Sequence, residues 1–213
     1  TEEMFDLLEI TLERFPDDIS VISYAGFIAT ESKQYDTAIE LFEEGLKACD
    51  TDEQRSQMLG YIGDIYHETG KDSKAFKAYR KALAYDSENI VVLNNYAYFL
   101  SLLDKDLELA LEMAEKAIKL APNNATYIDT YAWVLHRLGR NQEAKTAMSQ
   151  ALSISAQRDA SLLVHYGDIL WALGERFMAD TYWKKAVQQG FDKDALEEHI
   201  AELKSEPTKE NKR

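Results

Sequence analysis

Apolar side chains recur along most of the chain at steps of three and four residues, which is the spacing of one face of an α-helix. The stretch 125–158 shows the pattern most clearly. Its two halves carry apolar or small residues at this spacing: Ile128, Tyr131, Ala132 and Leu135 in the first, and Ala144, Met148, Ala151 and Leu152 in the second. The segment 138–141, Leu-Gly-Arg-Asn, separates the halves as a turn. We therefore predict two amphipathic helices joined by a short turn.

The same pattern, with a period near 34 residues, can be laid over most of the remaining sequence. We predict a single array over residues 1–204, made of a half repeat that supplies only a second helix, five full repeats and a capping helix: 2–18, 19–52, 56–89, 90–124, 125–158, 160–193 and 194–204. A three-residue insertion precedes the second full repeat, and the third has one extra residue in its turn. The polar segment 205–213 is expected to be disordered.

Three positions in each full repeat hold only alanine or glycine, as expected where helices cross closely. These are Gly26, Ala38 and Gly45; Gly63, Ala75 and Ala82; Ala97, Ala110 and Ala117; Ala132, Ala144 and Ala151; and Gly167, Ala179 and Ala186. A generic helical bundle has no reason to keep small residues at three fixed phases. The pattern therefore favours a repeat array over such a bundle, and a long side chain at one of these positions should overpack the crossing.

Residues 59–66, with Leu59, Ile62, Gly63 and Tyr66, followed by Ala75 and Tyr79, resemble the consensus of tetratricopeptide repeats. The stretches 93–100 and 121–140 are most similar to bacterial proteins with several such repeats. The resemblance covers residues 2–204 and implies an all-α, right-handed α-solenoid of stacked helix–turn–helix units with a C-terminal capping helix. The chain departs from the family where the usual tryptophan of the first helix is aliphatic: Ile22, Leu59, Leu93, Ile128 and Leu163.

Charge and composition exclude several function classes. The net charge of −14 is concentrated in residues 1–52, which hold 14 acidic and 3 basic side chains and so contribute −11. Such a field repels phosphate and anionic lipid, so we expect neither nucleic acid nor a membrane surface as the partner. No apolar run is long enough to span a bilayer. The single cysteine, Cys49, excludes an internal disulfide framework and a cysteine metal site.

The resemblance implies that the first helices of the repeats line a concave groove. The expected groove residues are mainly aromatic, acidic and amide side chains: Phe27, Tyr61, Asp64, His67, Asn94, Tyr98, Asp129, Trp133, His136, His165, Asp168 and Trp171. The family's best-known recognition mode clamps a terminal carboxylate with lysine, arginine and asparagine. The groove stripe holds no lysine or arginine, so a carboxylate clamp is not expected. A protein or peptide partner that is neutral to basic and carries apolar anchors fits better.

Two pairs on or beside this groove, Asp64 with His67 and His165 with Asp168, place an imidazole and a carboxylate on neighbouring helical turns. This spacing is compatible with metal ligation or acid–base chemistry. No HExxH or nucleophile motif accompanies either pair, so we expect no metal, no cofactor and no enzymatic activity.

Two functions remain open. The first is a protein-interaction scaffold that binds a peptide or protein segment in the groove. The alternative is a structural subunit that self-associates, or continues into upstream repeats, through the half repeat, whose apolar stripe includes Met4, Leu8, Leu12 and Phe15. The resemblance leaves both the bacterial cytoplasm and, with an upstream export signal, an exported lipoprotein as locations.

Overall fold

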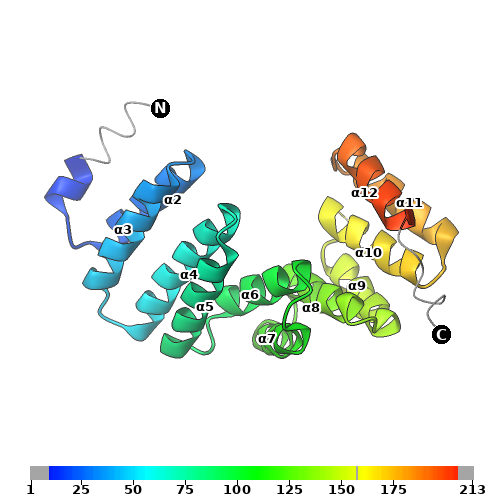
Figure 1. The fold of residues 1–213 in the computed structure, drawn as a ribbon, viewed down its shortest axis with the longest axis horizontal. Coiled ribbons are helices and arrows are strands. Elements are labelled where there is room, and N and C mark those ends of the chain that lie inside the picture. The colour runs from blue at the N-terminus through cyan, green and yellow to red at the C-terminus, as the bar shows by residue number, and fades with distance from the viewer. Residues whose placement is uncertain (1–9, 157, 206–213) are drawn as a thin grey trace. The chain divides into compact units, whose positions relative to one another are not determined.

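The structure is a computed structural model that describes residues 10–156 and 158–205. Over these ranges all regular secondary structure is helical, and residues 10–14 precede the labelled helices as a short helical stretch (Figure 1). The labelled helices are α2 (Ile19–Glu31), α3 (Tyr35–Ala48), α4 (Asp52–Glu68), α5 (Asp72–Tyr85), α6 (Ile90–Leu102), α7 (Leu107–Leu120), α8 (Ala125–Arg137), α9 (Asn141–Ile154), α10 (Ala160–Ala172), α11 (Arg176–Gln188) and α12 (Lys193–Ser205). The predicted all-α fold is confirmed over the described ranges.

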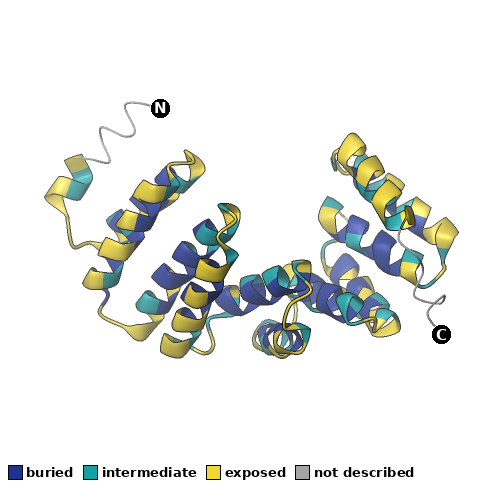
Figure 2. Ribbon diagram, in the orientation of Figure 1, coloured by how far each residue is buried: buried dark blue, intermediate teal, exposed yellow. Residues whose placement is uncertain are grey.

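The chain divides into two compact units between Leu103 and Asp104. In the first unit, α2 packs on α3 and α4 packs on α5, while α6 contacts both α4 and α5. In the second unit, α8 packs on α9 and α10 on α11, with α7 against α8 and α9 against α10. Figure 2 shows that the buried residues lie on the helix faces that are turned toward these neighbours. The helices thus form stacked pairs within each unit, as the repeat pattern predicts.

All fifteen predicted crossing positions are buried. The sizes of the two side chains that meet at a crossing are also related. Where the first helix has glycine, at Gly26, Gly63 and Gly167, an aromatic ring of the second helix lies against it: Phe42, Tyr79 and Trp183, respectively. Each ring lies 16 residues after its glycine, whereas Ala132 has Met148 at the same separation. A smaller residue on the first helix is therefore matched by a larger side chain on the second helix, which keeps the crossing filled as close packing requires.

Capping residues explain where the first helix of each repeat begins. The residue before each of these helices accepts backbone N–H hydrogen bonds through its side chain: Asp18, Thr51, Asn89, Asn124 and Asp159. Glycines with positive φ lie after α4, α8, α10 and α11: Gly70, Gly139, Gly174 and Gly190, respectively. The extra residue predicted in the third repeat is accommodated by two left-handed residues, Asp104 and Asp106.

The three inserted residues before the second full repeat are helical. Residues 53–55, which lie between the repeats 19–52 and 56–89, belong to the first turn of α4, which begins at Asp52. Thr51 and Gln54 form a capping box that starts the helix before the insertion, and α4 therefore has 17 residues where α2 has 13. At the other end, α12 includes Ser205, so the predicted tail lies largely outside the described residues.

Candidate functional site

An exposed aromatic pair lies on the first helices of the first unit. The Phe27 side chain on α2 is 41% exposed. Its ring meets the half-buried Tyr61 ring of α4 edge-on, with the centroids 4.7 Å apart. Both rings also contact buried Phe42 from below, at 5.7 and 5.1 Å between centroids. The core thus supports a rigid apolar surface that remains open on its outer side.

Tyr61 also borders a cavity of about 330 Å³ between α4 and α6, which we call the α4–α6 cavity. Its lining residues come from α4, from the loop before α6 and from α6 itself: Glu53, Gln57, Gly60, Tyr61, Asp64, Asp86, Glu88, Asn89, Ile90, Val91, Val92 and Asn95. Among these described lining residues, four are acidic and none is lysine or arginine. Gly60 lets α4 pack closely against α6 at the wall of the cavity, because a Cβ atom there would lie 2.8 Å from Val92 Cγ2.

Asp64 is the most enclosed carboxylate of this cavity. Its Oδ1 accepts a 2.6 Å hydrogen bond from the Tyr79 hydroxyl and a 3.0 Å hydrogen bond from Asn95 Nδ2. Asn94, predicted as a groove residue, is itself buried and donates to Asn95 Oδ1 at 3.2 Å. Burial raises the pKa of Asp64, although the hydrogen bonds from Tyr79 and Asn95 and the nearby His67 act in the opposite direction.

The hydrogen-bonding partner of His67 is Asp72 of α5, not Asp64 of its own helix. Its Nδ1 lies 2.9 Å from Asp72 Oδ1, and its ring stacks on Phe99 with the centroids 3.6 Å apart. Tyr98 is half-buried beside the same Phe99, at 5.8 Å between centroids. The first turn of the next helix therefore supplies the carboxylate that pairs with this histidine.

In the second unit, the predicted groove residues are largely buried. Trp133 is 8% exposed and stacks on His165 at 4.3 Å between centroids. His165 Nδ1 lies 2.8 Å from Asp129 Oδ1, so this imidazole pairs with a carboxylate of the neighbouring helix α8. His136 Nδ1 contacts Asn141 Oδ1 at 2.7 Å. These side chains hold α8 and α10 together, and they offer little surface to a ligand.

Asp168 is 1% exposed and joins three helices. Its Oδ1 accepts a 3.0 Å hydrogen bond from Trp183 Nε1 of α11, and its Oδ2 lies 2.8 Å from His199 Nε2 of α12. The hydrogen bond to Asp168 raises the pKa of His199. Burial alone would lower the pKa of His165, but Asp129 and Asp168 together raise it. Burial lowers the pKa of His136, whose only described hydrogen-bonding partner is the neutral Asn141.

Trp171 is half-buried, and its ring already lies beneath two cations of the same unit. The Arg176 guanidinium carbon is 3.4 Å from the ring centroid, and Lys204 Nζ of α12 is 5.1 Å from it. Arg176 Nη1 also donates to the Trp171 carbonyl at 2.9 Å. This tryptophan is thus engaged in intramolecular cation–π contacts.

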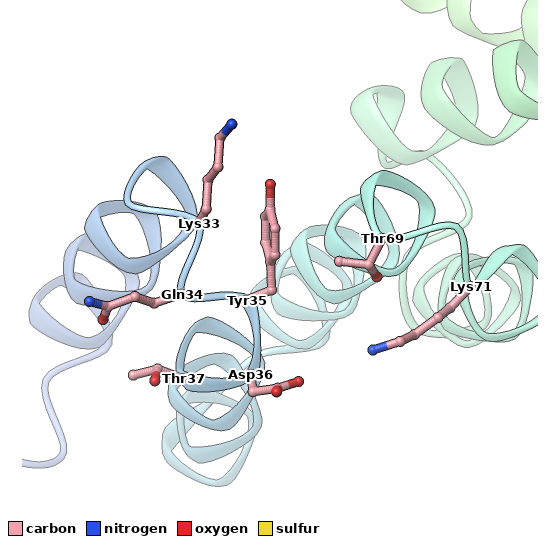
Figure 3. A pocket seen from close by; sticks show the side chains of 7 residues that line it. All are labelled: Lys33, Gln34, Tyr35, Asp36, Thr37, Thr69 and Lys71. Atoms are coloured by element: carbon pink, nitrogen blue, oxygen red, sulfur yellow. The ribbon is translucent and has the colours of Figure 1, made fainter.

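A second cavity of the first unit, about 410 Å³, lies at the turns after α2 and α4 (Figure 3). Lys33 and Lys71 reach it from the two different turns, and Asp36 and Tyr35 stand between them. The Tyr35 hydroxyl donates to Glu68 Oε1 at 2.7 Å. Because charges of both signs line this open cavity, it has no clear preference for a ligand charge.

Within the described residues, no cluster of three or more histidine, cysteine, aspartate or glutamate side chains could hold a metal ion. None of the described helices is both long and apolar enough to cross a bilayer. Cys49 is buried, and its thiol donates to the Gly45 carbonyl at 3.1 Å. Of the proposed self-association stripe, Leu12 is half-buried and Phe15 is 48% exposed, whereas Met4 and Leu8 lie outside the described residues.

Sequence periodicity missed the acidic rim of the α4–α6 cavity. Asp86 and Glu88 come from the loop before α6, outside any helical stripe. Gln57 lies one turn before Tyr61 on α4 and donates from its Nε2 to the Tyr61 hydroxyl at 2.5 Å, but its side chain type gives no special signal in the sequence. In the sequence, this rim is indicated only by the position of Asp86, Glu88 and Asn89 shortly before the helix that carries Val91 and Asn95.

Comparison with known proteins agrees with this fold. Two family models, both described as tetratricopeptide repeat, match residues 18–88 and 125–158. A search of curated protein sequences finds no significant match. Similar solved structures include PilF of Pseudomonas aeruginosa, with a TM-score of 0.71 and 20% identity, covering 84% of this chain and 79% of that one.

Two further structures are similar over most of this chain. A thermophilic protein of the same repeat class from Thermus thermophilus has a TM-score of 0.68 and 20% identity, with coverage of 87% of this chain and 98% of that one. YrrB, described as a repeat protein with an unusual peptide-binding site, has a TM-score of 0.64 and 17% identity, with coverage of 92% and 97%. The repeat matches, the stacked helix pairs and the small residues at their crossings identify the chain as a tetratricopeptide-repeat protein.

Proposed function

We propose that the protein is an interaction scaffold that binds a segment of a protein partner across α2, α4 and α6 of the first unit. The observation that carries this proposal is the exposed pair of Phe27 and Tyr61 beside the α4–α6 cavity. Rigid aromatic rings next to a cavity are frequent centres of binding energy in protein interfaces. The description of YrrB as having a peptide-binding site agrees with such a role for this repeat class.

The chemistry of this surface favours a partner with apolar anchors and neutral or basic side chains. Phe27 and Val91 provide exposed apolar area on α2 and α6, on either side of Tyr61. The carboxylates of the cavity would repel a terminal carboxylate, and no lysine or arginine among the described lining residues could clamp one. The proposed mode is therefore a groove without a carboxylate clamp.

The test is capture of partners from an extract of the source cell with the intact protein and with Phe27→Ala. The truncation should weaken partner binding by about 2 kcal/mol, which is roughly a 30-fold loss of affinity. Phe177→Ala is the matched control, because this phenylalanine is 81% exposed and lies on α11 in the other unit. A partner retained by Phe27→Ala with unchanged affinity, in a variant that melts like the wild type, would exclude this surface.

Self-association is a second candidate function, favoured by exposed apolar residues before α2. Ile10 is 61% exposed and Phe15 is 48% exposed. Sedimentation velocity of the intact protein tests this function, with Phe15→Glu as the perturbing variant and Phe177→Glu as its control. An oligomer dissociated only by Phe15→Glu supports an assembly role, and a monomer at all concentrations argues against it.

A further inference from the structure

We infer that the α4–α6 cavity is an arginine-recognition subsite, in which Asp64 receives the guanidinium group of an arginine in the bound partner segment. This inference rests on the proposed function, because it names the chemistry of a partner side chain for the same surface. The cavity, with about 330 Å³, has room for the end of one long side chain next to the aromatic pair.

The first step of the argument is that Asp64 is held in one orientation with one oxygen still available. Oδ1 is fixed by the Tyr79 hydroxyl from α5 and by Asn95 Nδ2 from α6. Among the described residues, none donates a hydrogen bond to Oδ2. An oriented carboxylate with an open oxygen accepts a strong, charge-assisted hydrogen bond from a cationic donor.

The second step is that no lysine or arginine among the described lining residues compensates this carboxylate, which has only His67 nearby. Glu53, Asp86 and Glu88 line the same cavity, and the described lining contains no lysine or arginine. Burial raises the pKa of Asp64, which means that the ionised form is disfavoured in its present surroundings. A cation that enters the cavity would stabilise the ionised form of the carboxylate, so the site is complementary to a positively charged ligand.

The third step distinguishes arginine from lysine. Gln57 Nε2 donates to the Tyr61 hydroxyl, and no described residue donates to the Gln57 carbonyl oxygen. Asp64 Oδ2 and this carbonyl oxygen are therefore two acceptors on the same helix, one turn on either side of the Tyr61 ring. A planar guanidinium has several donors in a fixed fork and also stacks on aromatic rings, whereas an ammonium group is a compact point charge.

The experiment titrates ¹⁵N-labelled protein with Nα-acetyl-arginine amide and follows the side-chain amide signals of Gln57 and Asn95. Nα-acetyl-citrulline amide, which has nearly the same shape without the charge, and Nα-acetyl-lysine amide are the comparison ligands. We expect saturating shifts of both signals with arginine, a Kd at least tenfold higher for citrulline, and an intermediate Kd for lysine.

Two variants test the role of the carboxylate. Asp64→Asn keeps an oxygen acceptor for Tyr79 and Asn95 while removing the charge, and should raise the Kd for the arginine compound at least tenfold. Asp36→Asn makes the same charge change at an exposed position of the same unit outside the cavity, and should leave the Kd within twofold. Gln57→Ala, at an exposed position, provides a further variant that leaves the Asp64 network intact and should raise the Kd about threefold.

Several results would overturn the inference. These are equal binding of arginine and citrulline, absence of shifts at Gln57 and Asn95, an Asp64→Asn variant that is folded and binds normally, or an equal loss in Asp36→Asn. If the arginine compound fails while Phe27→Ala still loses the partner, only the arginine subsite is wrong and the proposed function stands. If arginine binds in the cavity but Phe27→Ala retains its partner, the partner is bound elsewhere and the proposed function fails.

Discussion

Gly63→Ala is the substitution that tests the packing of the repeats most sharply. A Cβ atom at this position would lie 2.7 Å from Tyr79 Cδ1, well inside the usual carbon–carbon contact distance of about 3.5–4.0 Å. The Tyr79 ring must therefore move by roughly 1 Å. It is fully buried, and its hydroxyl is tied to Asp64 at 2.6 Å, so it cannot move without losing packing or this hydrogen bond.

The expected cost follows from three contributions. Overpacking of a core typically costs about 1–3 kcal/mol. A hydrogen bond to a charged group contributes about 1.5–3 kcal/mol, and the displaced ring loses part of it. Alanine in the middle of a helix is favoured over glycine by about 1 kcal/mol, which acts in the opposite direction. We therefore expect a net loss of about 2 kcal/mol in the free energy of unfolding.

Urea denaturation followed by circular dichroism measures this loss. The control is the double variant Gly63→Ala/Tyr79→Met, which copies the pair of Ala132 and Met148 in the fourth repeat. The double variant should be more stable than the sum of the two single variants predicts, because methionine leaves room for the new methyl group. A Gly63→Ala protein as stable as the wild type, or more stable, would refute the reasoning and leave helix propensity as the dominant effect.

Three further predictions concern buried charge, pH and the cavity. Asp168→Ala should lower the free energy of unfolding by about 3 kcal/mol, because it removes the acceptor of Trp183 Nε1 and the partner of His199, whereas Asp168→Asn should cost less in the same urea titration. The pKa of His199 is raised above its ordinary value of 6.5. The stabilisation from the protonated imidazole is therefore fully present below pH 6.5 and is lost as the pH rises through the folded-state pKa. The wild-type melting temperature should fall more steeply above pH 6.5 than that of His199→Gln. Gly60→Ser should press against Val92 at the wall of the cavity, distort the cavity and abolish the arginine-induced shifts, while leaving the helical signal in circular dichroism unchanged.

The fold could be predicted from the sequence because the same types of capping and packing residues recur from one repeat to the next. Thr51, Asn124 and Asp159 begin helices by capping them, and small residues recur where helices cross. The effect of the insertion before Ser56 could not be predicted, because a period alone does not say whether inserted residues lengthen a helix, as they do in α4, or a loop. The division after Leu103 depends on contacts between helices, which the period does not encode.

The candidate site could be predicted only in part. The groove expected from the family resemblance included Tyr61 and Asp64, which both line the α4–α6 cavity because side chains three or four residues apart share a helix face. The resemblance could not tell which members of that face remain open. Asp168 has the same phase as Asp64, but it is buried by Trp183 and by His199 of the final helix. Such partners are distant in sequence, so their contacts appear only in the folded structure.

The most direct measurement of the central claim is hydrogen–deuterium exchange of the protein with and without its captured partner. If the first unit provides the binding surface, protection should appear in residues 52–68 and 90–102, the segments of α4 and α6, and in α2 around Phe27. Residues 125–137 and 160–172, whose groove side chains are already buried, should exchange at unchanged rates. Protection confined to these second-unit segments, with α4 and α6 unaffected, would contradict the account.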